Sequence, residues 1–279
     1  MIPRADIIAW RHVAPWVSDA QVEQDLIMSR ALVAIFGNEF LARQLAFRGG
    51  TALNKLYFNP PRRYSEDIDI VQTEPGPIGP IFDGLQRVLN PFLGTPKRKQ
   101  ADGTVTLAYR VESEGPPVVP LRVKIEINTR EHFTVCGFEK ASFEVRSRWF
   151  TGSCVINTFC LEELLATKTR ALYQRRKGRD LFDLWLGITE SRADVDKTVK
   201  VFKRYMEKEG NTVGVQEFEK NLLDKMNHDG FAGDLESLLS ADMEYDPATA
   251  IAVVQREIIA RMDRKEREPD SLPAGRRIP

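Results

Sequence analysis

Two aspartates separated by one residue carry the strongest chemical signal in this 279-residue sequence. The segment Asp67–Val71 alternates acidic and apolar residues, which predicts a strand with Asp67 and Asp69 on one face. Residues two apart on a strand lie about 7 Å apart along the chain, so the two carboxylates could share one or two Mg²⁺ ions. Such ions can activate an attacking hydroxyl and neutralise charge on a leaving pyrophosphate. For the pair taken alone, a solvated strand edge is the alternative.

A third carboxylate, Glu126, lies on a second predicted strand, Leu121–Asn128. In that strand Val123, Ile125 and Ile127 alternate with polar residues. If the sheet places this strand beside the first, Glu126 faces both aspartates and is a third metal ligand. If it does not, Glu126 is a solvent-facing strand residue, and the sequence leaves both arrangements open.

A glycine-rich turn, Gly49, Gly50 and Thr51, precedes the acidic strand and separates two predicted helical segments. Glycine lets the backbone approach a phosphate closely, and the N-terminus of the following helix favours an anion. The turn is therefore a candidate nucleotide-binding loop. A plain turn between two helices is the alternative.

Lys168 lies in the apolar stripe of a predicted helix, Leu161–Arg176. A buried ammonium is costly unless it meets an anion, and the triphosphate of a substrate would supply one. Asp180 and Asp183 follow on one side of the next predicted helix, where Asp180 could hold Lys168 or Arg170 in place. The alternatives are a lysine that reaches water from the edge of the core and acids that complement a helix dipole.

A run of cations follows Lys168. It comprises Arg170, Arg175, Arg176, Lys177 and Arg179, and Arg43, Arg48, Arg62 and Arg63 could extend it. The formal net charge of the chain is zero, so a nucleic-acid partner would have to be bound by a local patch. Because the run adjoins the proposed phosphate site, we expect it to contact an RNA backbone. A solvated helix face is the alternative.

These residues are positioned by a mixed α/β region followed by helices. Further strands are expected at Thr104–Val111 and Phe143–Trp149, and helices at Ser18–Phe36, Ala52–Leu56 and Phe82–Leu93. The later helical segments are Leu161–Arg176, Arg179–Ile188, Asp194–Lys208, Val215–Met226 and Pro247–Arg264. Residues 1–157 are expected to form one domain, and residues 158–264 a helical domain that completes the site. The charged, proline-rich residues 265–279 are expected to be disordered.

Composition limits the class of protein. A hydrophobic content of 42% and a charged content of 29% are typical of a soluble globular chain. The three cysteines, Cys136, Cys154 and Cys160, lack metal-ligand spacing and are typical of reduced cytoplasmic thiols. The N-terminus lacks the apolar run of a signal peptide, and no segment is apolar for long enough to span a membrane. We therefore expect a cytoplasmic protein without a membrane partner.

Four short runs, in order, resemble the motifs of one family. The runs Phe47–Leu53 and Arg63–Asp69 resemble those of the AbiEii/AbiGii nucleotidyltransferase toxins, which include the mycobacterial MenT toxins. The runs Lys168–Leu172 and Arg179–Leu184 are similar to that family's third and fourth motifs. The family belongs to the DNA polymerase β-like superfamily, whose signature is a glycine pair before a D-x-D strand. Where that superfamily often has Gly-Ser, this chain has Gly50 and Thr51, which keeps the hydroxyl.

The resemblance implies an α+β fold with an N-terminal polymerase β-like domain, built on a mixed sheet, before a helical C-terminal domain. It also implies a metal-dependent enzyme that transfers nucleotides from an NTP to RNA, together with a cognate antitoxin. The MenT members extend the 3′ end of tRNA, which blocks aminoacylation and hence translation. By this resemblance the catalytic residues are Asp67, Asp69, Lys168 and Asp180, the metal ligands include Asp67 and Asp69, and the nucleotide-binding residues are Gly49, Gly50, Thr51, Ser65 and Lys168. The role of Asp180, beyond that of a second essential acid, stays open.

Two other functions fit fewer of these observations. A nucleotidyltransferase that modifies a small antibiotic would need a second acidic cleft to hold a cationic drug, and the sequence shows no clear one. A degenerate, non-catalytic binding protein would have no reason to keep Asp67, Asp69, Glu126 and Lys168 together. The identity of the NTP and of the RNA does not follow from the sequence.

Overall fold

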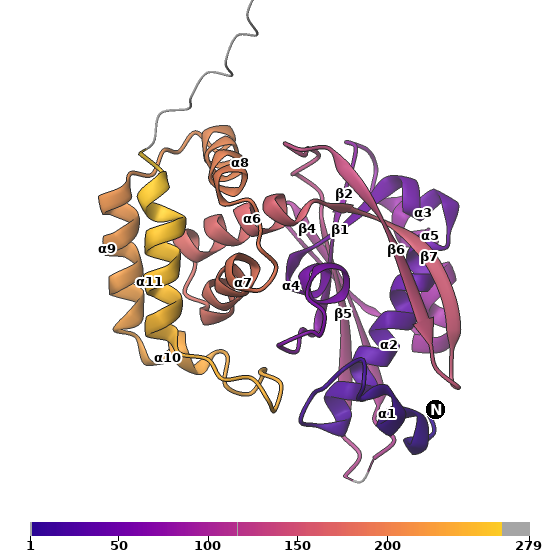
Figure 1. Cartoon of the computed structure of the whole chain (residues 1–279). Helices are drawn as coiled ribbons and strands as arrows, with labels where there is room; N and C mark the ends of the chain where they lie inside the picture. The colour runs from indigo at the N-terminus through magenta and orange to yellow at the C-terminus, as the bar shows by residue number, and fades with distance from the viewer. Residues whose placement is uncertain (1, 116, 264–279) are drawn as a thin grey trace, which may run out of the picture.

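Seven strands form one mixed sheet in the order β3-β4-β5-β2-β1-β7-β6 (Figure 1). The computed structural model describes residues 2–115 and 117–263. The strands are β1 (Leu45–Arg48), β2 (Asp67–Gln72), β3 (Lys97–Ala101), β4 (Thr104–Glu112), β5 (Pro120–Asn128), β6 (Phe138–Arg146) and β7 (Thr151–Phe159). Strand β2 is parallel to β5 and antiparallel to β1, and β1 is parallel to β7. The mixed sheet that the sequence predicts is confirmed.

One face of this sheet is apolar because its strands alternate in hydrophobicity. Ile68 of β2 and Ile125 of β5 are fully buried. The helices α2 (Asp19–Phe36) and α5 (Gly79–Leu93) pack against β5 and β4 on this side. The capping box predicted at Ser18–Gln21 starts α2, as expected. The opposite face is left to the acidic residues of β2 and β5.

The remaining helices surround the sheet or follow it in the chain. The early ones are α1 (Arg4–Trp10), α3 (Glu39–Gln44), α4 (Gly49–Ala52) and a π-helix, η1 (Leu53–Tyr57). The later ones are α6 (Leu161–Gln174), α7 (Gly178–Thr189), α8 (Val195–Lys208), α9 (Val215–Met226), α10 (Asp229–Gly233), α11 (Pro247–Glu257) and a 3₁₀ turn, η2 (Ile259–Arg261). In Figure 1 these later helices form a group beside the sheet, in which α6 packs against α7, α8 and α9. Within the described residues, no helix combines the length and apolar character needed to cross a membrane.

The succession of a mixed sheet and a helical group confirms the predicted α+β class. Apolar side chains from both parts join one continuous core. The predicted boundary after residue 157 lies near the end of β7, and the division into two domains stays a prediction.

Several predicted limits are wrong. The strand expected at Phe143–Trp149 is instead β6, which ends at Arg146 before a turn to β7. The sequence does not predict the helices α1 and α3 or the strands β1, β3 and β7. All five residues of β3 are exposed, so this edge strand has no alternating pattern. Helix α11 ends at Glu257, short of its expected end. Arg264 and the tail 265–279 lie outside the described residues.

Candidate active site

The structure brings the three predicted carboxylates to the polar face of the sheet. Strands β2 and β5 are parallel neighbours, with Asp67 beside Lys124 and Asp69 beside Glu126. Adjacent strands lie about 4.8 Å apart, so Glu126 adjoins Asp69, as it must to serve as a third ligand. The arrangement in which Glu126 is only a solvent-facing residue is therefore not the one adopted.

The carboxylates bring several negative charges together at a partly buried site. Burial, together with the charges of Glu126 and Asp67, raises the pKa of Asp69 to about 6. Burial also raises the pKa of Asp67, although the Lys124 ammonium 3.3 Å from its Oδ2 opposes that shift. Lys124 lies on the same strand face as Glu126 and is 2.5 Å from its Oε1. One ammonium thus serves two carboxylates, and the cluster keeps an excess of negative charge.

This donor set fits a divalent cation of the magnesium type. All three groups are hard oxygen donors, and burial together with the neighbouring carboxylates raises the pKa values of Asp67 and Asp69. Within the described part of the chain, only Cys136, Cys160 and Glu163 bring three ligand atoms within 4.8 Å of one another. The three carboxylates are therefore more widely spaced, as expected for mutually repelling groups.

The turn at Gly49 and Gly50 fits tightly around this cluster. Gly49 has a φ of +79°, and a Cβ there would lie 2.1 Å from Asp69 Oδ2. A Cβ on Gly50 would lie 2.3 Å from the Arg63 guanidinium. Both positions exclude a side chain, the first because of conformation and contact and the second because of contact. Of the turn residues, Gly49 borders the cavity described below.

Thr51 and Ser65 hold the start of β2. The Thr51 hydroxyl donates to the Asp67 backbone carbonyl and lies 2.8 Å from Ser65 Oγ. Because a carbonyl can only accept, the proton between the two hydroxyls comes from Ser65. Ser65 precedes the first residue of β2 and is not among the residues that line the cavity. The nucleotide contact expected of both hydroxyls stays a prediction.

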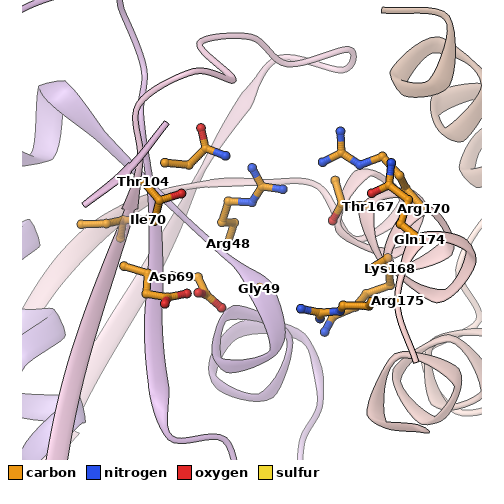
Figure 2. A pocket seen from close by; sticks show the side chains of 13 residues that line it. Arg48, Gly49, Asp69, Ile70, Thr104, Thr167, Lys168, Arg170, Gln174 and Arg175 are labelled. Carbon is orange, nitrogen blue, oxygen red and sulfur yellow. The ribbon is translucent and has the colours of Figure 1, made fainter. Parts of the chain in front are cut away.

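A cavity of about 370 Å³ opens over Asp69 and Glu126, and Asp67 is not among the residues that line it. Figure 2 shows Asp69 on the sheet side of the cavity and Lys168, Arg170 and Arg175 of the α6 segment across from it. Glu126 of β5 also lines the cavity. Arg48, the last residue of β1, projects between the two sides. One wall of the cavity is thus acidic and the other is basic, and the two walls come from separate segments of the chain, β2 and β5 on one side and the α6 segment on the other.

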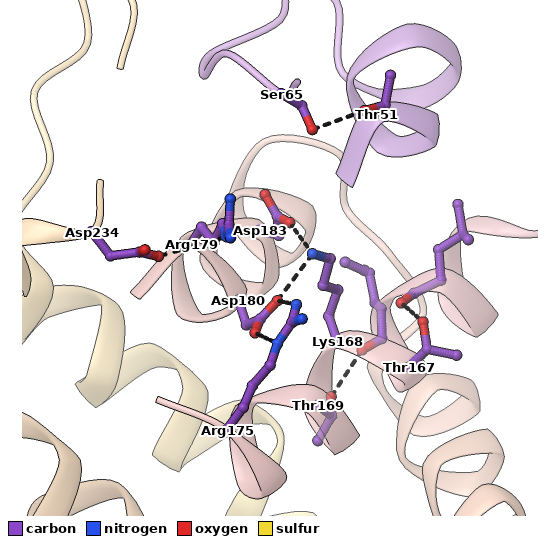
Figure 3. A network of polar contacts seen from close by, with 12 residues as sticks. Thr51, Ser65, Thr167, Lys168, Thr169, Arg175, Arg179, Asp180, Asp183 and Asp234 are labelled. Carbon is purple, nitrogen blue, oxygen red and sulfur yellow. Dashed lines mark hydrogen bonds and ion pairs between the residues drawn. The ribbon is translucent and has the colours of Figure 1, made fainter. Parts of the chain in front are cut away.

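Lys168 is paired with Asp180, as the sequence suggested it could be, and also with Asp183. Its ammonium lies 3.0 Å from Asp180 Oδ1 and 2.8 Å from Asp183 Oδ2 (Figure 3). Arg175 makes two hydrogen bonds to Asp180, and Arg63 makes two to Asp183. The expectation that Lys168 needs a phosphate to compensate its charge is wrong, because these two carboxylates already do so.

This network has one more cation than it has acids. Burial alone would raise the pKa of Asp180, but Lys168 and Arg175 hold it well below its usual range. The pKa of Asp183 is lowered in the same way, against its burial, by Arg63 and Lys168. Both aspartates are fully buried. The net positive charge therefore faces the cavity through Lys168 and Arg175.

The predicted basic run does not form one surface. Arg170 is buried between Glu131 and Glu209, at 2.6 and 2.7 Å. Lys177 and Arg179 both pair with Asp234, and Arg179 appears at this contact in Figure 3. Arg176 is exposed and has no ion pair with any described residue. Arg170 and Arg175 line the cavity, whereas the rest of the run points elsewhere.

The sequence does not identify Glu131, which holds two arginines of the cavity in place. It binds Arg48 at 2.5 Å as well as Arg170. Its loop is held by the fully buried Glu163, which accepts hydrogen bonds from Thr134 and from the backbone of Val135 and Cys136. Nothing local in the sequence marks Glu131. Lys124 could have been recognised, because it alternates in phase with Glu126 on one predicted strand.

Comparison with known proteins adds to this geometry. A profile for the family described as "Nucleotidyl transferase AbiEii toxin, Type IV TA system" matches residues 30–254. The crystal structure of JHP933 from Helicobacter pylori is 17% identical, with a TM-score of 0.52 over 88% of this chain and 94% of that one. MenT4, a nucleotidyltransferase toxin from Mycobacterium tuberculosis H37Rv, is 15% identical, with a TM-score of 0.53 over 94% and 99%. At these identities the likeness shows a shared fold. No curated protein sequence matches the chain significantly.

Proposed function

Since the chain belongs to the AbiEii nucleotidyl transferase toxin family, we propose that it transfers nucleotides from an NTP to RNA. The acceptor that we propose is the 3′ end of tRNA, whose modification would block translation. One observation carries the chemistry: a single cavity has carboxylates on one wall and cations on the other. Nucleotidyl transfer needs both, because a metal-binding group and a phosphate-binding group must act on one triphosphate.

The acidic wall is the proposed metal site. Asp67, Asp69 and Glu126 would hold one or two Mg²⁺ ions, which supply charge neutralisation at the phosphates and activation of the attacking hydroxyl. Gly49 permits this by leaving room for the Asp69 carboxylate. Lys124 keeps Asp67 and Glu126 near each other when no cation is bound.

The basic wall is the proposed triphosphate site. Lys168 and Arg175 would bind phosphate oxygens, and Arg48 and Arg170 would add positive charge beside them. Asp180 is fully buried and bonded to Lys168 and Arg175. It would therefore position the two cations and remain away from the reacting atoms. Thr51 and Ser65 would hold the glycine turn against the start of β2, and they would contact the nucleotide if that turn moves.

The same wall weighs against an antibiotic-modifying enzyme. Four cations line the cavity, three of them opposite Asp69, so the cavity lacks the second acidic wall that would hold a cationic drug. An RNA end, whose phosphates are anionic, would be attracted. We propose a cognate antitoxin and action in the cytoplasm from the family, which is a type IV toxin–antitoxin family.

The proposal is tested by incubating the protein with each labelled NTP, Mg²⁺ and total RNA, and sizing the labelled product. We expect one or more NTPs to label RNA of tRNA size, and EDTA to abolish labelling. Asp69→Asn removes a metal ligand with little change in shape, so it should abolish labelling with the fold intact by circular dichroism. Full activity in Asp69→Asn would rule out the carboxylate mechanism. Labelling of a small molecule alone would transfer the assignment to the antibiotic-type enzyme.

A further inference from the structure

The sheet continues beyond the cavity as a basic face. Four cations, which we call the sheet-face cations, lie on β3, β4 and β5; they are Lys97, Lys99, Arg110 and Arg122. We propose that the backbone of the acceptor RNA lies across these cations as its end enters the cavity. This inference rests on the proposed function and names the surface that holds its substrate.

Strand register places the sheet-face cations on the carboxylate side of the sheet. Asp69, Glu126, Thr106 and Lys99 are successive partners across β2, β5, β4 and β3. Cross-strand partners share a face, so Lys99 lies on the face of Asp69. Three strand spacings of about 4.8 Å put Lys99 roughly 14 Å from Asp69 along this row.

A neighbouring row repeats the pattern. It joins Asp67, Lys124, Ala108 and Lys97 in the same strand order. Arg110 and Arg122 are partners two residues further along β4 and β5. Between the cations the face carries Thr106 and Ala108, whose small side chains leave a phosphodiester backbone free to approach the sheet.

This face is open, whereas the opposite one is covered. All four sheet-face cations are exposed. The described helices that pack against β4 and β5 are α5 and α2, and both lie on the apolar face. Arg98, between Lys97 and Lys99, points to that covered side, where its guanidinium lies 4.0 Å from the centre of the Phe82 ring.

The sheet-face cations also have no charged partner in the part of the chain that the structure describes. None of them forms an ion pair with any described residue, and the one further acid of these rows on their face is Glu112. In the predicted basic run only Arg176 lacks an ion pair with a described residue, whereas Lys177 and Arg179 share Asp234 and Arg170 lies between Glu131 and Glu209. Unpaired cations release counterions when they meet phosphates, and paired ones gain less. Charge complementarity therefore favours the sheet over the helix.

The cavity connects the two surfaces. Thr104, Glu126 and Asn128, which belong to β4 and β5, line it. An RNA strand that crosses the sheet face can therefore deliver its terminal hydroxyl to the carboxylates without crossing another element. The triphosphate would occupy the α6 side, opposite the incoming strand.

The test compares three double variants of the full chain. The first is Lys97→Gln with Lys99→Gln on the sheet face, and the second is Arg176→Gln with Lys177→Gln in the basic run. The third, Lys200→Gln with Lys220→Gln, removes two exposed cations from α8 and α9 as a matched control. For each variant we would measure the affinity for tRNA at several salt concentrations, labelling of RNA from the NTP, and the thermal midpoint.

We expect the sheet-face variant alone to weaken tRNA binding, by about 5-fold for two exposed charge contacts. Its salt slope should flatten by about 1.4, or roughly 0.7 for each lost phosphate contact. All three variants should keep the thermal midpoint of the parent, because every substituted side chain is at the surface.

An unchanged salt slope in the sheet-face variant overturns the inference, and a change confined to Arg176→Gln with Lys177→Gln moves the RNA to the helix. In both cases labelling of RNA by the parent protein would leave the proposed function standing. A parent protein that labels no RNA overturns the proposed function and this inference together.

Discussion

At the scale of single residues, Lys168 shows how a buried charge is accommodated. It lies between Asp180 and Asp183, and each of these also binds an arginine. The ammonium is thus a structural centre as well as a cavity-lining cation. Substitutions of Lys168 therefore act on stability and on function together.

Lys168→Met should destabilise the protein. Methionine preserves length and apolar packing but leaves two buried carboxylates with one cation fewer, at a cost on the order of 3 kcal/mol. The free energy of unfolding in urea measures this. Lys197→Met breaks a partly exposed pair with Glu162 and should cost less than about 1 kcal/mol. Equal losses in the two variants would contradict a buried network at Lys168.

The lowered pKa values of Asp180 and Asp183 predict acid sensitivity. A carboxyl whose folded pKa lies below its unfolded value of about 3.9 stabilises the fold above that value. This stabilisation is lost as the pH falls through the folded pKa, so the decline lies below about pH 4. Asp69 acts in the opposite sense, because protonation below its pKa of about 6 relieves repulsion in the metal-free protein.

The measurement is the unfolding free energy between pH 7 and pH 3. Asp183→Asn should be less stable than the parent at pH 7 and should lose less stability between pH 5 and pH 3. Parallel curves for the two proteins would show that Asp183 does not carry the acid dependence.

At the scale of elements, the junction from β1 to α4 positions the carboxylate wall. Arg48 ends the strand beside Asp69, and Gly49 turns the chain with a positive φ. The side chain of Asp69 occupies the space that a Cβ on Gly49 would take. This turn thus fixes the positions of both Arg48, which lies between the two walls, and Asp69, which lies on the acidic wall.

Gly49→Ala should abolish nucleotide transfer and lower stability. The added Cβ meets Asp69 at 2.1 Å, and a positive φ costs an L-residue about 1 to 2 kcal/mol. Gly94→Ala is a matched control, because Gly94 has a φ of +76° with nothing within 4 Å of its Cβ position. Labelling of RNA and the thermal midpoint separate the two effects. If Gly94→Ala lost as much activity, strain alone would explain the result.

At the scale of the whole molecule, the sheet and the helices share both core and charge. Arg63 lies in the segment before β2 and is only 1% exposed, and two of its hydrogen bonds reach Asp183 of α7. The cavity itself needs β2 and β5 from one part and α6 from the other. Neither part contains a complete site.

We expect the chain to unfold in a single transition. A chain ending at Cys160 would lack the carboxylate that pairs with Arg63 and would expose the apolar surface that the helices cover, so it should not fold. Calorimetry of the full chain and circular dichroism of the truncated one test this. Two resolved transitions, or a folded truncated chain, would establish independent domains.

The features that the sequence determined by itself depend on residues within one short segment. Alternation at Asp67–Val71 placed two acids on one strand face, and the capping box at Ser18 started a helix where expected. Both depend on backbone geometry within a few residues. The edge strand β3 has no such alternation, because all five of its residues are exposed. Its sequence therefore contains no periodic pattern that predicts a strand.

The partners of charged side chains were decided only by the tertiary structure. The basic run reads as one patch in the sequence, yet Arg170 meets Glu131 and Glu209 while Lys177 and Arg179 meet Asp234. An ion pair depends on which distant segments the fold brings within about 4 Å, and a linear pattern contains no such distance. The sequence thus indicates which residues could bind a metal ion or a phosphate, and tertiary packing decides which of their charges remain free for a substrate.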